Sequence, residues 1–356
     1  AAGAGLRLLI GAHKDRLWHK PAWHRVPEIT RAWPMTAETT EAANAYGGLL
    51  YVVVPRGAKL GTIEVALEGA VAAPRFVLGE TTNATWRATV RQAPAPWAEL
   101  ETGKVILTVP SSAIRALDDP EALLVWWDRV LDGCADLAAR PRERVRPERY
   151  VTDVQISAGY MHAGYPIMTH LDAAPRFVDL ERLSTKGDWG MFHEMGHNHQ
   201  SRDWTFAGTG EVTVNLFSLY LMETVCEKGI GHRAMSPKSI AKNRATFHES
   251  EDRFTLWKRS PFLALIAYYE LKQAFGWDAY KRVFAEYRDL PKSARPKNDD
   301  EKRDQWLIRM SRTVGRDLGP FFESWSIPTS SAARAAVADL PAWMPGAEAS
   351  DGRSGD

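Results

Sequence analysis

The sequence predicts an α+β protein, with a β-sandwich domain at its N-terminus and a mainly helical domain after it. Up to residue 110, short apolar segments rich in β-branched residues are separated by Gly, Pro or Asn, which is typical of strands and turns. After Pro110, longer segments repeat their apolar residues at helical spacing. We therefore expect domains at 1–110 and 111–345, and a mobile tail at 346–356 where Gly, Ser and Asp are frequent.

The individual elements follow from the same patterns. Strands are expected in the first domain at 49–54, 62–68, 76–78, 85–90 and 105–109. Helices are expected in the second domain at 120–139, 263–275, 278–287 and 299–314. A further strand at 151–157 is expected to lead into Gly159 and Tyr160.

Composition excludes several classes of protein. A chain of 356 residues with 45% apolar residues and a net charge of +1 is typical of a soluble globular protein, and the near-neutral balance argues against nucleic acid as the main partner. No run approaches the roughly 20 apolar residues that span a bilayer, and residues 1–5 lack the features of a secretory signal, so a trimmed or mature form is expected. The two cysteines, Cys134 and Cys226, exclude a disulfide scaffold; we expect buried thiols, with a single bridge left open. We expect a monomer.

The most informative motif is the stretch HEMGH at 193–197. Residues four apart lie on one face of a helix, so His193 and His197 can bind one zinc ion, while Glu194 lies beside the metal as a general base. Asp188 is a suitable N-cap for this helix. A zinc-bound water activated by Glu194 could attack an amide, because zinc lowers the pKa of that water and the carboxylate accepts its proton.

The third ligand is expected to be Glu211, the first acidic residue of a second, largely apolar helix at 211–223. A purely electrostatic role at the helix N-terminus is the competing interpretation of Glu211. The metzincin pattern is excluded because Gln200 stands where that pattern has Gly, which leaves Asp203 as a weaker alternative ligand.

Two nearby polar residues are candidates to support the ligands. Asn215 lies one turn after Glu211 and could orient a ligand, or could be an ordinary buried amide. His199 points away from the face shared by His193 and His197, so we expect it to support a ligand or face the substrate rather than bind the metal.

Separated segments of the chain match one known pattern in order. They are IGAH at 10–13 with RVP at 25–27, NAYGGLLYVVVP at 44–55, GYMHAGYPI at 159–167, HEMGHNHQ at 193–200, GEVTVNLFSLY at 210–220 and FFESW at 321–325. Together they resemble the enhancin-like zinc metallopeptidases, the M-sixty family of the gluzincins. The resemblance implies a gluzincin-type catalytic domain with one Zn²⁺ held by His193, His197 and Glu211, and Glu194 as the base. It also implies O-glycosylated or mucin-like protein substrates and a secreted or cell-surface location.

Hydrolysis of an amide also needs a donor that stabilises the oxyanion. Tyr160, His162 and Tyr165 lie in a Gly-rich segment that the resemblance places near the cleft, and Tyr165 is slightly favoured. Tyr268, Tyr269 and His248 are further candidates, and each of these residues could instead be a packing or surface side chain. Trp204 could stack on a sugar, although a core position is the default for an indole.

Three functions remain open on the sequence. The first is a zinc endopeptidase that acts on O-glycosylated, mucin-like proteins. The second is a gluzincin aminopeptidase or general protease without glycan dependence. An aminopeptidase would need an acidic residue, such as Glu223 or Asp188, to bind the free amine of the substrate. The third is a catalytically silent binding protein, which the presence of all four zinc-site residues disfavours. No nucleic acid and no membrane span are expected.

Overall fold

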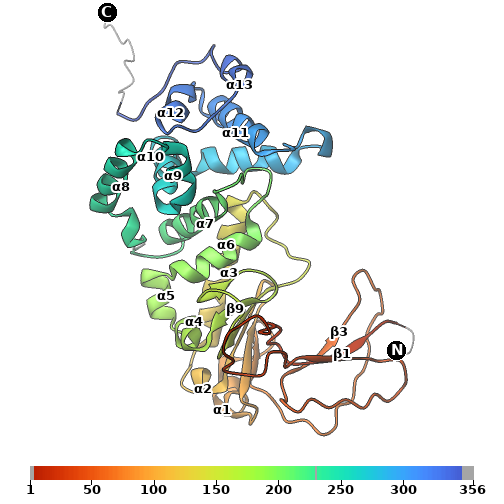
Figure 1. The fold of residues 1–356 in the computed structure, drawn as a ribbon. Coiled ribbons are helices and arrows are strands. Elements are labelled where there is room, and N and C mark those ends of the chain that lie inside the picture. Colours follow the sequence, from red (N-terminus) through yellow and green to blue (C-terminus); the bar gives the residue numbers. More distant parts are fainter. Residues whose placement is uncertain (1–3, 229–230, 347–356) are drawn as a thin grey trace, which may run out of the picture. The chain divides into compact units, whose positions relative to one another are not determined.

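The computed structural model describes residues 4–228 and 231–346, which form two compact units (Figure 1). Among the described residues, the first unit comprises 4–131 and 143–185, and the second comprises 132–142, 186–228 and 231–346. The long helix α3 (Pro120–Leu137) contributes residues to both. The two units are therefore not simply consecutive in the sequence, because the chain enters the second unit briefly and returns to the first.

The first unit contains a three-stranded antiparallel sheet near the N-terminus (Figure 1). Its order is β2 (Arg31–Pro34), β1 (Arg7–Ile10) and β3 (Leu50–Val53), with β1 in the centre.

A six-stranded mixed sheet forms the centre of the first unit. Its order is β4 (Arg75–Val77), β5 (Trp97–Glu101), β6 (Val105–Pro110), β7 (Glu148–Asp153), β9 (Ile167–His170) and β8 (Met161–His162). Strands β6, β7 and β9 are parallel to one another, whereas β8 is an antiparallel edge strand. Five of the six residues of β6 are buried, as its nearly continuous apolar run requires of a central strand.

Helix α3 covers this sheet through Trp127. The Trp127 indole is fully buried, lies 5.6 Å from the Tyr150 ring on β7, and donates a hydrogen bond to the Phe177 carbonyl. The remaining helices of this unit are α1 (Asn83–Ala88), α2 (Ser111–Ile114), α4 (Ala174–Phe177) and α5 (Leu180–Lys186).

The second unit is helical in its described residues. Its helices are α6 (Trp189–His199), α7 (Gly210–Thr224), α8 (Pro237–Glu249), α9 (Arg253–Arg259), α10 (Pro261–Asp289), α11 (Asp299–Val314), α12 (Gly319–Ser324) and α13 (Ser331–Ala335). An aromatic core joins α10 to α11, where Trp306 contacts Tyr280 and Phe284.

The predicted helices are confirmed with small shifts in their bounds. The interval between 263–275 and 278–287 corresponds to Gly276, whose φ of 73° interrupts α10. Helix α11 begins after the cap Asn298 and ends before Gly315, which takes the left-handed conformation that favours glycine at this position.

The β-sandwich predicted for residues 1–110 is not confirmed. The strands of this segment lie in two different sheets, and the larger sheet is completed by β7, β8 and β9 from beyond residue 110. The parallel pairing of β6 with β7 therefore crosses the predicted domain boundary. The tail predicted at 346–356 lies, apart from Gly346, outside the described residues.

Two predicted strands are absent at their positions. Residues 62–68 form no strand, and the segment 85–90 mostly belongs to helix α1. The Thr82 hydroxyl accepts a hydrogen bond from the Thr85 N–H and caps this helix, while the Trp86 side chain is fully buried. The cap and the buried indole outweigh the β propensity of the threonines. The strand expected at 151–157 begins earlier and ends at Asp153.

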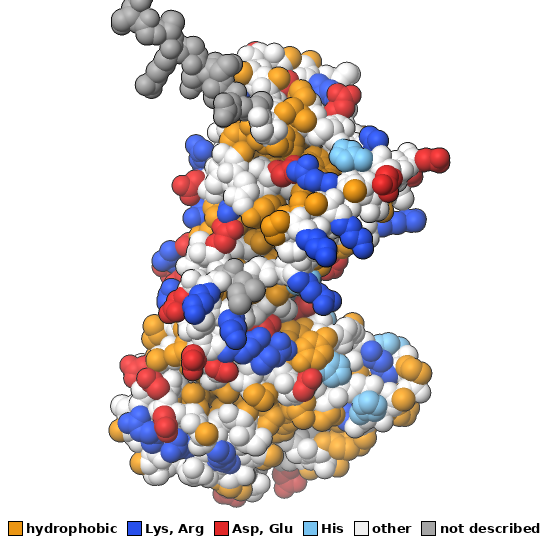
Figure 2. Space-filling model, turned by 90° about the vertical axis from the view of Figure 1, so that its left-hand side faces the viewer, with side chains coloured by type: hydrophobic (Ala, Val, Ile, Leu, Met, Phe, Trp, Pro, Cys, Tyr) orange, Lys and Arg blue, Asp and Glu red, His pale blue; other side chains and the backbone are white. Residues whose placement is uncertain are grey.

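The cysteine expectation agrees with the described residues. Cys134 and Cys226 are buried and unbridged. Figure 2 shows acidic and basic side chains interspersed over the face that it draws, in keeping with a net charge of +1. Within residues 4–228 and 231–346, no helix is long and apolar enough to cross a bilayer.

Candidate metal centre

Helix α6 presents two imidazoles on one side and packs the other side into the core. The Asp188 carboxylate caps the helix by accepting a hydrogen bond from the Met191 N–H at 3.2 Å. Phe192 and Met195 are fully buried, whereas His193 and His197 are only half-buried. The spacing of four residues thus places both imidazoles on the accessible side of α6.

Helix α7 brings a carboxylate to the same point. Residues 212–222 of α7 are buried, but the Glu211 side chain in the first turn is 60% exposed. Its Oε2 lies 3.0 Å from His193 Nε2 and 3.6 Å from His197 Nε2, and the two Nε2 atoms are 3.2 Å apart. Among the described residues, these three side chains form the group whose donor atoms could hold a metal ion.

The three separations fit a tetrahedral zinc ion. Ligand bonds of about 2.0–2.1 Å at tetrahedral angles place neighbouring donor atoms about 3.3 Å apart. The separations of 3.0, 3.2 and 3.6 Å scatter around that value. Two imidazoles and one carboxylate are also a donor set that leaves a fourth position for water or substrate.

Gly196 allows the two helices to approach closely enough for this convergence. A Cβ atom at Gly196 would lie 2.9 Å from the Phe217 Cβ and 2.9 Å from Val214 Cγ2, both on α7. Such contacts are shorter than real side chains make, so any other residue here would push α6 away from α7. The glycine within the motif is therefore a packing requirement rather than a site of flexibility.

Each imidazole is oriented by an amide oxygen on its other nitrogen. Asn215 Oδ1 lies 2.7 Å from His193 Nδ1, and the Asn215 Nδ2 donates to the Glu211 carbonyl at 2.7 Å. Gln200 Oε1 lies 3.2 Å from His197 Nδ1, and its Nε2 donates to the Gly210 carbonyl at 2.8 Å. Because an amide oxygen can only accept, both contacts favour a proton on Nδ1 and leave Nε2 available for a metal.

The role of Gln200 was missed by the sequence analysis, which considered this residue only as a departure from the metzincin pattern. Its position three residues after His197, at the C-terminal end of α6, is the signal that could have revealed it. Asn215 was a candidate for this kind of role, and the structure places it beside His193.

The charges of the group favour an ionised Glu211. The His193 and His197 imidazoles beside its Oε2 hold the pKa of the Glu211 carboxyl well below its usual range. Burial by itself would lower the pKa of His193, but its contacts with Glu211 and Asn215 and the charge of Glu194 outweigh burial and raise it. Glu194 is half-buried on α6 directly after His193, where its carboxylate adds negative charge beside the group.

Two predicted site residues of this unit belong to the core. The Trp204 indole is only 3% exposed and stacks on the Phe284 ring at a centroid distance of 4.1 Å. This burial corrects the prediction that Trp204 stacks on a sugar, because protein side chains cover the indole. His199 is 2% exposed, and its Nδ1 lies 2.7 Å from the Met195 carbonyl within the same helix.

Two further candidates, Tyr268 and Asp203, make other contacts, and Asp203 is not in the group of side chains that could hold a metal ion. Tyr268 is 3% exposed among Trp257 and Trp306, and burial raises its pKa, so it is a core residue and not an oxyanion donor. Asp203, the alternative ligand, lies 3.7 Å from the Arg295 guanidinium.

Tyr160, His162 and Tyr165 belong to the first unit, whereas the metal-binding group belongs to the second, so their roles toward substrate stay predictions. Tyr160 is 46% exposed and donates to Asp172 at 2.8 Å. The Tyr165 ring is covered by Arg146, whose guanidinium carbon lies 3.5 Å from the ring centroid.

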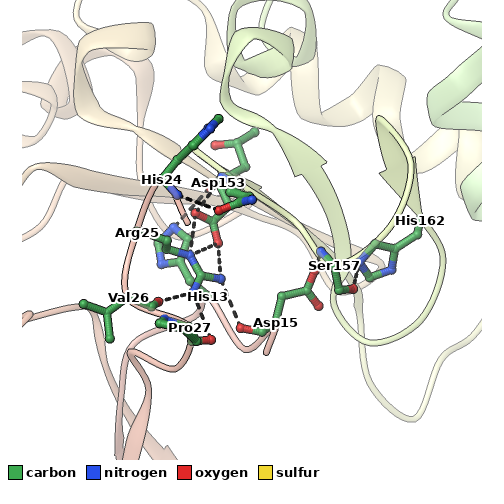
Figure 3. Close-up of polar contacts among 11 residues, drawn as sticks. His13, Asp15, His24, Arg25, Val26, Pro27, Asp153, Ser157 and His162 are labelled. Carbon is green, nitrogen blue, oxygen red and sulfur yellow. Dashed lines mark hydrogen bonds and ion pairs between the residues drawn. The ribbon is translucent and has the colours of Figure 1, made fainter. Parts of the chain in front are cut away.

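His162 is held by two residues of the same unit (Figure 3). Its Nε2 lies 2.7 Å from Asp15 Oδ2 and 3.0 Å from Ser157 Oγ. A Ser-His-Asp triad needs the acid on one imidazole nitrogen and the serine on the other. Because both partners share Nε2 here, this cluster is not a nucleophilic triad.

Sequence comparison gives two adjoining matches. Residues 69–326 match the family described as peptidase M60, enhancin and enhancin-like, and residues 1–68 match the N-terminal domain of M60-like peptidases. TRPM8 channel-associated factor 2 from Bos taurus is 42% identical over 346 residues, which is 96% of this chain and 37% of that protein. The chain thus spans little more than a third of the length of this curated relative.

Solved structures share the fold. A conserved protein of unknown function from Bacillus anthracis superposes with a TM-score of 0.71 at 24% identity, covering 96% of this chain and 70% of that one. The catalytic module of the metalloprotease ZmpA from Clostridium perfringens superposes with a TM-score of 0.62 at 15% identity, covering 96% and 70% respectively. At these identities, the likeness establishes the fold alone.

Proposed function

The chain belongs to the peptidase M60 family of enhancin and enhancin-like proteins, and on this premise we propose that it is a zinc-dependent endopeptidase that cuts O-glycosylated, mucin-like proteins. The observation that carries the proposal is the meeting of His193, His197 and Glu211 donor atoms within 3.0–3.6 Å. A secreted or cell-surface location accompanies this substrate class.

The residues around the metal-binding group have different roles in the proposed reaction. His193, His197 and Glu211 would hold the zinc ion, and bound zinc would supply Lewis acidity at the scissile carbonyl. Glu194 takes a proton from the attacking water and passes it to the leaving amine. Asn215 and Gln200 keep the two imidazoles in the orientation and tautomer that metal binding requires.

Glu194→Gln is the most direct test of the chemistry. The substitution keeps the size of the side chain and removes its ability to accept a proton, so we expect a loss of on the order of 10²–10⁴-fold in kcat with zinc content and folding unchanged. Peptide cleavage and metal analysis of the same preparation check both parts. Activity close to that of the parent chain would contradict the mechanism.

The substrate class is supported by the family and needs its own experiment. The chain, with and without a zinc chelator, is incubated with an O-glycosylated mucin fragment and with the same fragment stripped of sugars. We expect chelator-sensitive cleavage of the glycosylated fragment alone. Equal cleavage of both fragments would instead establish a peptidase without glycan dependence.

An aminopeptidase is disfavoured by the positions of two acidic residues. Glu223 binds Lys272 at 2.6 Å and accepts from the Trp277 indole at 2.8 Å, while Asp188 is buried as the cap of α6. Both carboxylates are thus engaged within the protein. A peptide with a free N-terminal amine and the same peptide with an acetylated N-terminus should therefore be cleaved at similar rates.

A second candidate is a binding role without catalysis, since the relative that is 42% identical is named for its association with the TRPM8 channel. The presence of His193, Glu194, His197 and Glu211 favours a peptidase. Absence of cleavage of both mucin fragments by the zinc-loaded chain would favour the binding role.

A further inference from the structure

One loop of the first unit, residues 13–27, exposes two indoles. The Trp18 and Trp23 side chains are 62% and 53% exposed, and their rings meet edge to face at a centroid distance of 5.6 Å. Single exposed apolar residues are common on protein surfaces, but two adjacent exposed tryptophans are a concentrated apolar surface and typical of binding sites.

The start of this loop alternates between buried and exposed residues. His13, Asp15 and Leu17 are buried, whereas Lys14, Arg16 and Trp18 are exposed. An extended segment with period-two alternation turns one set of side chains inward and the other outward. The outward set is therefore basic and aromatic.

The single acidic residue of the loop is turned inward. Asp15 Oδ2 accepts hydrogen bonds from the Ser157 N–H at 2.6 Å and faces His162 Nε2 at 2.7 Å (Figure 3). Although acidic and basic side chains are interspersed on the face in Figure 2, the exposed charges of residues 13–27 are all basic. Arg16 pairs with Glu28, which lies just beyond the loop.

The loop is held in this conformation by buried contacts. Arg25 forms an ion pair with Asp153 at 2.7 Å, with both side chains at most 8% exposed (Figure 3). Gln155 accepts from the His24 N–H at 2.7 Å and donates to the Ala22 carbonyl at 2.9 Å.

Within the loop, the Trp23 indole N–H donates to the Leu17 carbonyl at 3.0 Å. The two indoles are therefore presented by a fixed scaffold, which lowers the entropic cost of binding.

We propose that residues 13–27 form a docking surface for an anionic membrane. Indoles favour the interface between lipid headgroups and acyl chains, and lysine and arginine side chains nearby are attracted by anionic headgroups. The exposed Trp18 and Trp23 side chains meet the first requirement. The basic neighbours, with Asp15 turned inward, meet the second. This proposal does not rest on the proposed peptidase activity.

The test uses the 356-residue chain and vesicles of phosphatidylcholine, with or without phosphatidylserine. We expect sedimentation with the vesicles that contain phosphatidylserine, weakening as salt is raised, and little binding to phosphatidylcholine alone. Brominated acyl chains in the vesicles should quench tryptophan emission. Trp18→Ala/Trp23→Ala should abolish both binding and quenching, whereas Tyr46→Ala, which removes another exposed aromatic side chain, should change neither.

A charge variant separates the electrostatic contribution. Lys14→Ala/Lys20→Ala should weaken binding by about fivefold for each lysine, because each basic residue near an anionic surface contributes about 1 kcal/mol. The matched control Arg56→Ala/Lys59→Ala removes two exposed basic residues outside the loop and should bind like the parent chain.

Two results would overturn the proposal. One is undiminished vesicle binding by the double tryptophan variant. The other is an absence of binding to anionic vesicles, and retention on heparin in that case would assign the loop to a soluble polyanion. Peptidase assays of the same variants are expected to match the parent chain, so failure of the membrane proposal leaves the proposed activity untouched.

Discussion

Two amide side chains, Asn215 and Gln200, determine how the metal-binding imidazoles are presented. Each places an oxygen against an Nδ1 atom, at 2.7 Å and 3.2 Å respectively. We expect Asn215→Ala or Gln200→Ala to lower zinc affinity by about 10–100-fold, because the imidazole loses its fixed orientation and tautomer. Competition with a chromophoric chelator measures this. Gln305→Ala on α11 is the control, and an equal loss in that variant would show a general effect on folding.

Asp15 is predicted to make stability depend on pH. Burial alone would raise its pKa, but the hydrogen bonds from His162 and the Ser157 N–H outweigh burial and lower the pKa below 3.8. Asp15 therefore stabilises the folded state above pH 3.8, and this contribution is lost as the pH falls through the lowered folded-state pKa.

Asp15→Asn should accordingly cost roughly 1.5–3 kcal/mol of unfolding free energy at pH 7, the range for hydrogen bonds to a charged group. Urea unfolding at a series of pH values measures the difference in unfolding free energy between Asp15→Asn and the parent chain. This difference should shrink as the pH drops below 3.8. Asp118→Asn, in an ion pair whose Asp118 side chain is 73% exposed, should change stability by at most about 1 kcal/mol. A difference in unfolding free energy that stays constant with pH would refute a stabilising role of the ionised Asp15 carboxylate.

The contact between α6 and α7 is the element on which the metal centre depends, since two donors lie on one helix and the third on the other. We expect Gly196→Ala to cost about 1–3 kcal/mol of stability, because its Cβ would overlap Phe217 and Val214. Zinc affinity should fall as well, since the helices would move apart. Gly210→Ala is the matched control, because no atom lies within 4 Å of its added Cβ. Denaturant unfolding and zinc titration of both variants test this.

For the folded chain as a whole, zinc is expected to act as a stabilising ligand. A ligand at 1,000 times its Kd adds about 4 kcal/mol to the unfolding free energy if it binds the native state alone. A chelator should therefore lower Tm, and added zinc should restore it. In Glu211→Ala, which removes one donor, the Tm should respond far less to either treatment. A full response in that variant would exclude Glu211 as a ligand.

The helical parts of the chain could be predicted well because their signals are local. Helix α11 has its cap Asn298, its apolar spacing and its terminal Gly315 within one continuous segment. The strands were harder, since strand pairing depends on residues far apart in the sequence. The segment at 85–90 was misassigned as a strand because its β-branched residues favour strands, whereas the Thr82 cap contact and the burial of Trp86, which favour helix α1, are seen only in the structure.

The sequence by itself determined the metal-binding motif, the helices that carry it and the family to which the chain belongs. The spacing of His193 and His197 fixes their common helical face through local geometry alone. Only the tertiary structure decided that Gln200 orients His197, that Trp204 is buried against Phe284, and that Asp15 turns inward from a basic aromatic loop. Each of these depends on contacts between segments that are separate along the chain, and such contacts arise only when the helices and sheets pack together.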